Sequence, residues 1–381
     1  MANEKNLLQE PEVLLFQTSP FGNLDAIVQH NGETVYFYLN ERPVENRPPK
    51  FGMRACWVQN LVEGKLVFNM NAIDQGEPPL FPRTHTLHRE GQPLPATDSL
   101  SVVWFEEGNG AALVQTDPDS DESKTLSVIP PWSGDNGFMG YAFECAAESH
   151  FCSPLPKEGP LHDRIEKAQA FWNSFGGDTP TPFAVQQPKQ LATYREYFRT
   201  ADKDHSEPQN ETYFNINGEN FPPRGLVEFR SGGRLFLLTT GMSIVPQPNV
   251  ELTSEYPSKL RRVELAFQAD LNLLTDDAIN QARQNFSSLA ALPWRQFNWL
   301  GAGHSCSFPD VIDGCDSAVL VHETARATMQ SGNLSSRVEL GSFREDPVNL
   351  LWIVPVDNDQ MQRLEKHESS VVELAKEAWA N

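Results

Sequence analysis

The sequence predicts a mixed fold, α+β or mixed α/β, with two domains that each contain a mixed or mainly antiparallel sheet and a few packed helices. Strand-like runs are interrupted by only a few helical segments, without regular alternation of strand and helix. A length of 381 residues exceeds the roughly 100 to 200 residues typical of one domain. A polar stretch with two prolines divides the chain near its middle.

The first half is predicted to be a series of strands that ends in a helix. Asn31-Gly32 is a hairpin signal between the first two strands, and the acidic run 117–122 is expected to be a solvated hairpin loop. An apolar helical face follows Pro160 and stops at Gly176-Gly177. The expected strands cover 25–29, 34–39, 55–58, 65–70, 101–106, 111–115, 125–129 and 139–145.

The stretch 178–182, Asp-Thr-Pro-Thr-Pro, is the best linker candidate. Two X-Pro steps in a short polar segment favour extended backbone. We therefore expect a β-rich N-terminal domain over 1–178, a linker at 179–182 and a C-terminal domain over 183–381.

The second half is predicted to open with a helix over 189–200 and to contain a helix capped by Thr275 and stopped by Pro293. The clearest element is the strand 348–356, whose β-branched and aromatic run fits burial on both faces. Asp357 then offers a helix N-cap, and the apolar stripe that follows is interrupted at 367–370, which indicates a kink or two short helices. The other expected strands cover 213–216, 226–229, 235–240, 262–268, 317–322 and 337–340.

The composition is strongly acidic, with 30 basic and 51 acidic residues and a formal net charge of -21. An acidic surface repels nucleic acid and anionic membranes, so the charge favours a cationic protein partner. No signal sequence begins the chain, and no apolar run reaches the roughly 20 residues of a membrane helix, which predicts a cytoplasmic protein. The five cysteines are an odd, sparse set and are expected to be free thiols.

Three stretches suggest chemistry, and in each the structural interpretation is favoured. His304 lies beside Ser305 and Cys306, so a hydrolase that uses a pocket with His304 and a cysteine is the alternative function; neighbouring residues on an extended segment, however, point to opposite faces. Cys145 and Cys152 with His150 have poor spacing for zinc. The glycine-containing turns lack a following helix that would cradle phosphate. We expect no catalytic residue, metal or cofactor.

The loop 132–137 is a candidate interface. Trp132 stands among flexible polar residues that include Asp135, and tryptophan is enriched at interface hot spots. The structural alternative, in which Trp132 plugs the end of a sheet, stays open.

Three segments of the second half, in this order, resemble the suppressor-of-fused domain. The stretch 235–243 is an apolar strand ending in Gly241-Met242-Ser243, and 263–267 is similar to the Glu-Leu-x-Phe strand of that family. The third is the closing strand with its acidic-capped helix. Between the second and third, 297–305 resembles the family's loop with a glycine and histidine ending. The resemblance covers roughly 183–381.

The resemblance implies a mixed α/β domain that acts by binding a protein partner and not by catalysis. It adds Trp299 and His304 to Trp132 and Asp135 as candidate partner-binding residues. In bacterial members the family is associated with toxin immunity, so the leading hypothesis is a bacterial immunity or regulatory protein that sequesters a basic partner such as a cationic toxin. In the eukaryotic domain an acidic residue precedes the loop histidine, whereas Gly303 stands there in this chain.

Overall fold

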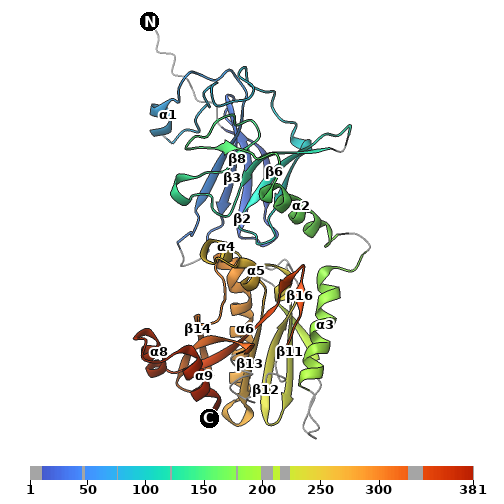
Figure 1. Cartoon of the computed structure of the whole chain (residues 1–381), viewed down its shortest axis with the longest axis vertical. Helices are drawn as coiled ribbons and strands as arrows, with labels where there is room; N and C mark the ends of the chain where they lie inside the picture. Colours follow the sequence, from blue (N-terminus) through green and yellow to red (C-terminus); the bar gives the residue numbers. More distant parts are fainter. Residues whose placement is uncertain are drawn as a thin grey trace. The chain divides into compact units, whose positions relative to one another are not determined.

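The computed structural model describes residues 11–44, 48–74, 76–120, 122–176, 179–198, 209–214, 224–324 and 338–380 (Figure 1). It has the predicted mixed fold, with several sheets and packed helices. The chain divides into two compact units, Met1–Asn173 and Ser174–Asn381.

The described part of the first unit contains two sheets and a covering helix. One sheet is antiparallel, with strands in the order β1 (Glu12–Thr18), β2 (Leu24–His30), β3 (Thr34–Glu41) and β4 (Met53–Asn60). The other has the order β5 (Leu100–Trp104), β6 (Ala111–Thr116), β7 (Ser123–Ile129), β8 (Tyr141–Ala142) and β9 (Ser153–Pro154). The sheets contact each other through β4, β7 and β8. The remaining elements are α1 (Met70–Asp74), α2 (Pro160–Asn173) and the 3-10 turns η1 (Thr97–Ser99) and η2 (Asp135–Gly137).

Helix α2 covers the second sheet of this unit. Ile165 and Ala168 are buried in one cluster with Val103, Ala112 and Val128 from strands β5, β6 and β7. The spacing of three residues between Ile165 and Ala168 places them on one helical face, as the apolar pattern predicts.

The hairpin signal at Asn31-Gly32 is confirmed, and the strand predicted over 65–70 is wrong. Strands β2 and β3 pair antiparallel across the turn, where Gly32 has a φ of 87°. In the 65–70 stretch Val67 is 73% exposed, while Phe68 packs with its ring centroid 5.2 Å from that of Phe81. Packing of a single half-buried ring in an aromatic cluster replaces the alternate burial that a strand requires.

Two further elements of the first unit differ from the prediction. Strand β1 lies outside the predicted strands. The strand predicted over 139–145 is reduced to the two residues of β8. The chain there turns toward β9, which pairs parallel with β8.

The described part of the second unit is built on a seven-stranded sheet of order β10-β11-β12-β13-β18-β15-β14. The strands are β10 (Gln209–Phe214), β11 (Arg224–Ser231), β12 (Arg234–Thr240), β13 (Val263–Asp270), β14 (Ser305–Ile312), β15 (Cys315–His322) and β18 (Asn349–Val356), with a separate hairpin of β16 (Ser342–Phe343) and β17 (Asp346–Pro347). The helices are α3 (Pro182–Tyr197), α4 (Val250–Thr253), α5 (Pro257–Leu260), α6 (Asp276–Gln296), α8 (Asn358–Glu365) and α9 (Val371–Ala380), with 3-10 turns η3 (Met242–Ile244) and η4 (Leu271–Leu273).

Helices cover both faces of this sheet. Tyr194 of α3 and Leu374 of α9 are buried with Phe229 and Trp352 on one face. On the other face Arg283 of α6 donates from Nε to Oε2 of Glu228 at 2.8 Å. Glu228 precedes Phe229 on the same strand, and neighbouring residues of a strand point to opposite faces. The sheet is therefore the middle layer between α3 with α9 and α6.

The closing segment follows the sequence prediction. Strand β18 lies inside the sheet, parallel to β13 and antiparallel to β15, which explains its continuous apolar run. Asp357 caps α8 in a reciprocal capping box with Gln360. The interruption at 367–370 is confirmed as a boundary between two helices, α8 and α9.

The predicted ends of two helices were wrong. Helix α3 begins at Pro182 and not at residue 189, because Thr181 caps it by accepting a hydrogen bond from Ala184 N at 3.3 Å and Pro182 suits the first helical position. Helix α6 continues past Pro293 to Gln296 and ends where Phe297 takes a left-handed conformation, with a φ of 46°. The strand predicted over 337–340 is also wrong, because residues 338–340 form no strand. Residues 199–200, 215–216 and 337 of the predicted elements lie outside the described residues.

A buried carboxylate joins three elements of the second unit. Glu264 of β13 is fully buried, and its Oε1 accepts hydrogen bonds from Ser243 N at 2.9 Å, Ser243 Oγ at 2.7 Å and Gln190 Nε2 at 2.9 Å. Its Oε2 accepts one from Thr239 Oγ1 at 2.6 Å. Burial raises the pKa of Glu264, and these donors oppose the rise. The carboxylate therefore ties α3, β12 and η3 to β13.

Substitution Glu264→Ala should destabilise the chain by about 2–4 kcal/mol at pH 5, because it leaves several buried donors without an acceptor. Urea unfolding followed by circular dichroism measures this change. Glu255→Ala, which removes an exposed carboxylate, is the control and should stay within about 0.5 kcal/mol of the parent. Equal midpoints for the two variants would contradict the proposed role of Glu264.

The cost of Glu264→Ala should also fall as the pH rises. A carboxyl group whose folded pKa is raised contributes most stability below its unfolded pKa, about 4.3, and loses this contribution as the pH passes through the folded value. Unfolding curves of the parent and Glu264→Ala between pH 4.5 and 8 test the trend. A difference that grows with pH would contradict it.

Candidate functional site

The parallel strands β13 and β18 diverge at their carboxyl ends. They pair from Val263 opposite Asn349 to Phe267 opposite Ile353. Beyond this point β13 continues with β12 alone, where Asp270 lies opposite Arg234, and the last residues of β18 continue with β15. The sheet is therefore open between the ends of two neighbouring central strands.

A proline accounts for the divergence. Leu271 N donates to Gly233 O at 2.9 Å, and in an antiparallel ladder hydrogen-bonding residues alternate, so the backbone groups of Gln268 face β18. The same alternation, counted from the bond between Leu320 N and His304 O, turns Pro355 toward β13. The next rung would need an N–H at Pro355 for the Gln268 carbonyl, and proline has none.

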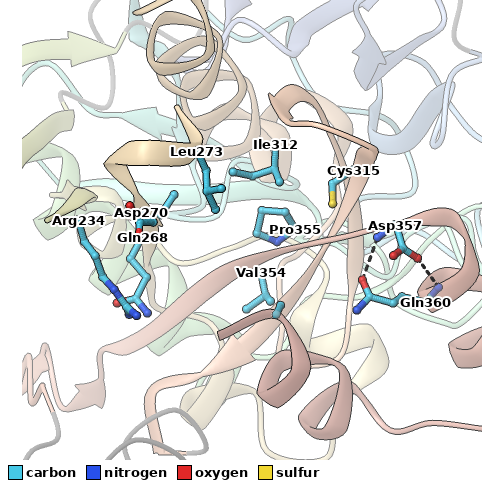
Figure 2. Close-up of a pocket in the computed structure, with 12 residues that line it drawn as sticks. Arg234, Gln268, Asp270, Leu273, Ile312, Cys315, Val354, Pro355, Asp357 and Gln360 are labelled. Atoms are coloured by element: carbon cyan, nitrogen blue, oxygen red, sulfur yellow. Dashed lines mark hydrogen bonds between the residues drawn. The ribbon is translucent and has the colours of Figure 1, made fainter. Parts of the chain in front are cut away.

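A cavity of about 220 Å³ lies at this opening (Figure 2). Its residues come from the ends of strands β12, β13, β14, β15 and β18, from η4, and from helices α8 and α9 with the cap of α8. The apolar lining is Ala269, Leu273, Ile312, Val354, Pro355 and Ala378, and the polar lining is Arg234, Gln268, Asp270, Cys315, Asp357 and Gln360.

The cavity holds polar groups with unused bonding capacity. Gln268 is 7% exposed, and its Nε2 has no hydrogen-bond partner among the described residues. Asp270 and Asp357 are helix caps that each use Oδ1, accepting from Asn272 N at 2.8 Å and from Gln360 N at 2.7 Å. Figure 2 shows the two carboxylates on opposite sides of the cavity.

The electrostatic environment of the cavity is negative beside Cys315. Burial raises the pKa of the Cys315 thiol, and the carboxylates of Asp357, Asp316 and Asp313 add to the rise. The thiol therefore stays protonated at neutral pH, and the site favours positive over negative groups.

A second candidate surface is the loop between α6 and β14, where Trp299 and His304 contact each other. Their rings lie 4.4 Å apart in an edge-to-face arrangement, and His304 Nδ1 lies 3.2 Å from the Trp299 carbonyl oxygen. A Cβ at Gly301 would overlap the Trp299 ring. Gly303 has a φ of 92°, which favours glycine. The glycines therefore let the loop fold around this pair.

The geometry disfavours the alternative hydrolase. Burial raises the pKa of the Cys306 thiol to about 12, so it is a poor nucleophile at neutral pH. The hydrogen bond of the His304 ring to a backbone carbonyl fits a structural role in the loop.

Trp132 and Asp135 lie in the first unit. Trp132 is half-buried, with its ring centroid 5.9 Å from the Arg164 guanidinium, while Asp135 is exposed at the start of η2. The four predicted partner-binding residues thus form two pairs, one in each unit.

The cysteines and the histidine whose spacing is poor for zinc differ in exposure. Cys145 and Cys152 are buried, and Cys152 Sγ lies 3.9 Å from Cys56 Sγ, whereas His150 is exposed. This arrangement is that of core thiols with a surface histidine.

The cavity was not predicted from the sequence. Two sequence features mark its place, namely the glutamine within the apolar strand 263–269 and the proline within 348–356. Only the pairing of β13 with β18 relates them.

Part of the second unit matches a known protein family. A family model described as "Suppressor of fused protein (SUFU)" matches residues 227–381. Residues 227–381 form a suppressor-of-fused domain. This family is a non-enzymatic binding and regulatory family, and the match covers only this part of the chain.

Among solved structures, the chain is similar to one in "the Sufu-Fu complex crystal structure". The match has 12% sequence identity, covers 48% of this chain and 79% of the other, and has a TM-score of 0.31. The comparison with curated proteins found no match. Within the described parts of the chain, no helix is long and apolar enough to cross a membrane.

The signature segments of the suppressor-of-fused domain meet in space. Gly241 ends β12 with a φ of 81°, and the next turn presents Ser243 to Glu264, the first residue of the Glu-Leu-x-Phe segment. Two of the segments that carry the resemblance are therefore joined by hydrogen bonds.

Substitution Gly301→Ala should displace Trp299 and destabilise the chain by about 1–3 kcal/mol, because the added methyl group overlaps the indole ring. Loss of the ring contact should shift the His304 ring signals in NMR spectra. Ala302→Ser, an exposed change in the same loop, is the control. Unchanged His304 signals in Gly301→Ala would refute the packing described for this loop.

Proposed function

We propose that this chain is a non-enzymatic protein-binding module that sequesters a basic protein partner in the cytoplasm. The observation that carries the proposal is the suppressor-of-fused domain at residues 227–381. The raised pKa of Cys306 and the structural contact of His304 support binding over catalysis.

The charge of the chain supports a cationic partner. A net charge of -21 attracts a basic protein over long range and accelerates the encounter at low ionic strength. The same charge opposes binding to nucleic acid.

A bacterial immunity role fits this combination best. A basic toxin, such as a nuclease with a positively charged substrate-binding surface, complements an acidic inhibitor. The support is the net charge together with the resemblance to bacterial members of the family.

Two surfaces are proposed for the partner. Trp299 with His304 presents a half-buried aromatic pair on a loop of the second unit, and Trp132 with Asp135 presents a similar loop in the first. Half-buried tryptophans combine a large apolar area with few rotamers to lose, which suits a hot spot.

The test is co-expression of the chain with the product of a neighbouring gene that encodes a basic toxin domain. We expect the parent chain to protect the cell and to bind the toxin with an affinity that falls with added salt. Trp299→Ala and Trp132→Ala should each weaken binding about tenfold or more, as measured by calorimetry. Tyr256→Ala, a loss of another exposed aromatic ring, is the control and should bind within about twofold of the parent.

Two results would count against this function. One is equal toxicity with and without the chain. The other is binding that neither salt nor either tryptophan substitution alters.

A further inference from the structure

The cavity between the diverging ends of β13 and β18 contains hydrogen-bond acceptors with unused capacity. The backbone carbonyl of Gln268 faces β18, where Pro355 has no N–H to donate. Asp270 and Asp357 each spend one carboxylate oxygen on a helix cap and leave the other to the cavity side. Buried acceptors without donors are costly, so a ligand rich in N–H groups would be stabilised there.

The charge of the residues around the cavity also favours a ligand with positively charged N–H groups. Asp270 and Asp357 line the cavity, and Asp313 and Asp316 lie close enough to raise the pKa of Cys315. The one basic lining residue, Arg234, lies opposite Asp270 in the strand register and balances one of these carboxylates. The remaining negative charge complements a cation.

The shape and walls of the cavity fit a long cationic side chain. Leu273, Ile312, Val354 and Ala378 form apolar walls suited to a methylene stem. A volume of about 220 Å³ exceeds the roughly 150 Å³ of a cavity that holds benzene. The stem of a lysine or arginine can therefore be buried while its charged head reaches one carboxylate.

Gln268 distinguishes a peptide from a free cation. Its Nε2 is a buried donor without a partner among the described residues, and it lines the same cavity (Figure 2). A donor next to a cation site needs an acceptor from the ligand, and a peptide carbonyl supplies one on the same residue that carries the cationic side chain.

We propose that this cavity binds a lysine or arginine side chain presented by an extended segment of the protein partner, with the carboxylate of Asp357 as the cation acceptor and that of Asp270 adding to the negative charge of the cavity. The inference rests on the proposed function, because it assigns to the basic partner one anchoring residue and a place in the fold. The Gln268 amide contacts the backbone of the same segment.

The test is an NMR titration of the full chain with acetyl-Val-Lys-Val-amide and with acetyl-Val-Gln-Val-amide. The Gln268 side-chain amide is the reporter, and it is assigned from its absence in Gln268→Met. We expect the lysine peptide to shift this signal in a saturable way, with an affinity at least tenfold above that of the glutamine peptide.

The variants separate binding from folding. In Asp270→Asn/Asp357→Asn each asparagine still caps its helix, so the fold is retained while both charges are lost. We expect this variant to raise the dissociation constant of the lysine peptide about tenfold or more. Asp277→Asn, which removes an exposed charge at the start of α6, should leave it within twofold. Ala378→Phe, which fills the cavity, should abolish the shift.

Three outcomes would overturn the proposal: equal affinity for the two peptides, unchanged affinity in Asp270→Asn/Asp357→Asn, or tighter binding of free arginine or spermine than of the peptide, which would assign the site to a small cation. The whole partner provides a separate comparison. If Asp270→Asn/Asp357→Asn binds the toxin as tightly as the parent, the cavity proposal fails and the proposed function stands. If the parent binds no toxin while the peptide binds in the cavity, the proposed function fails and the site stands.

Discussion

The buried carboxylate of Glu264 is the constraint on which the suppressor-of-fused domain depends. It is fully buried and accepts four hydrogen bonds. Two come from the backbone and side chain of Ser243, and one each comes from the side chains of Thr239 and Gln190. Ser243 and Thr239 lie on η3 and the adjoining β12, whereas Gln190 lies on α3, much earlier in the chain. A buried charge without such partners would be strongly destabilising, so the elements that supply the donors must be in place when β13 is buried.

A second polar cluster extends this arrangement along the same strand. Arg262 Nε donates to Asp346 Oδ2 at 2.9 Å, and its Nη1 donates to the Ser243 carbonyl at 3.0 Å. The turn after β12 is therefore held by Glu264 through its N–H and by Arg262 through its carbonyl. Strand β13 begins rigidly at this end and is free of β18 at the other, where Pro355 ends the ladder. The hydrogen bonds at the start of β13 fix the turn after β12, and the separation of β13 from β18 at the other end leaves the cavity.

Residues 348–356 illustrate how much of the fold was predictable. The strand, the Asp357 cap and the break between α8 and α9 follow from local patterns, namely an apolar run, a capping residue and an interrupted stripe. The candidate site was less predictable. The loop with Trp299 and His304 was found from its resemblance to the family, whereas Gln268 and Asp270 resembled the end of an ordinary strand. Their significance depends on a neighbour about 85 residues further along the chain, for which local patterns contain no information.

The sequence by itself determined the fold class, the order of most elements, the acidic character and the resemblance of the second half to suppressor of fused. These properties depend on composition and on periodicity over a few residues. The tertiary structure decided which strands pair, that Ser243 meets Glu264, that Trp299 packs over Gly301 and that Pro355 faces Gln268. Strand pairing joins distant segments, and one residue of register decides which face and which backbone groups each residue presents. The cavity exists because of that register.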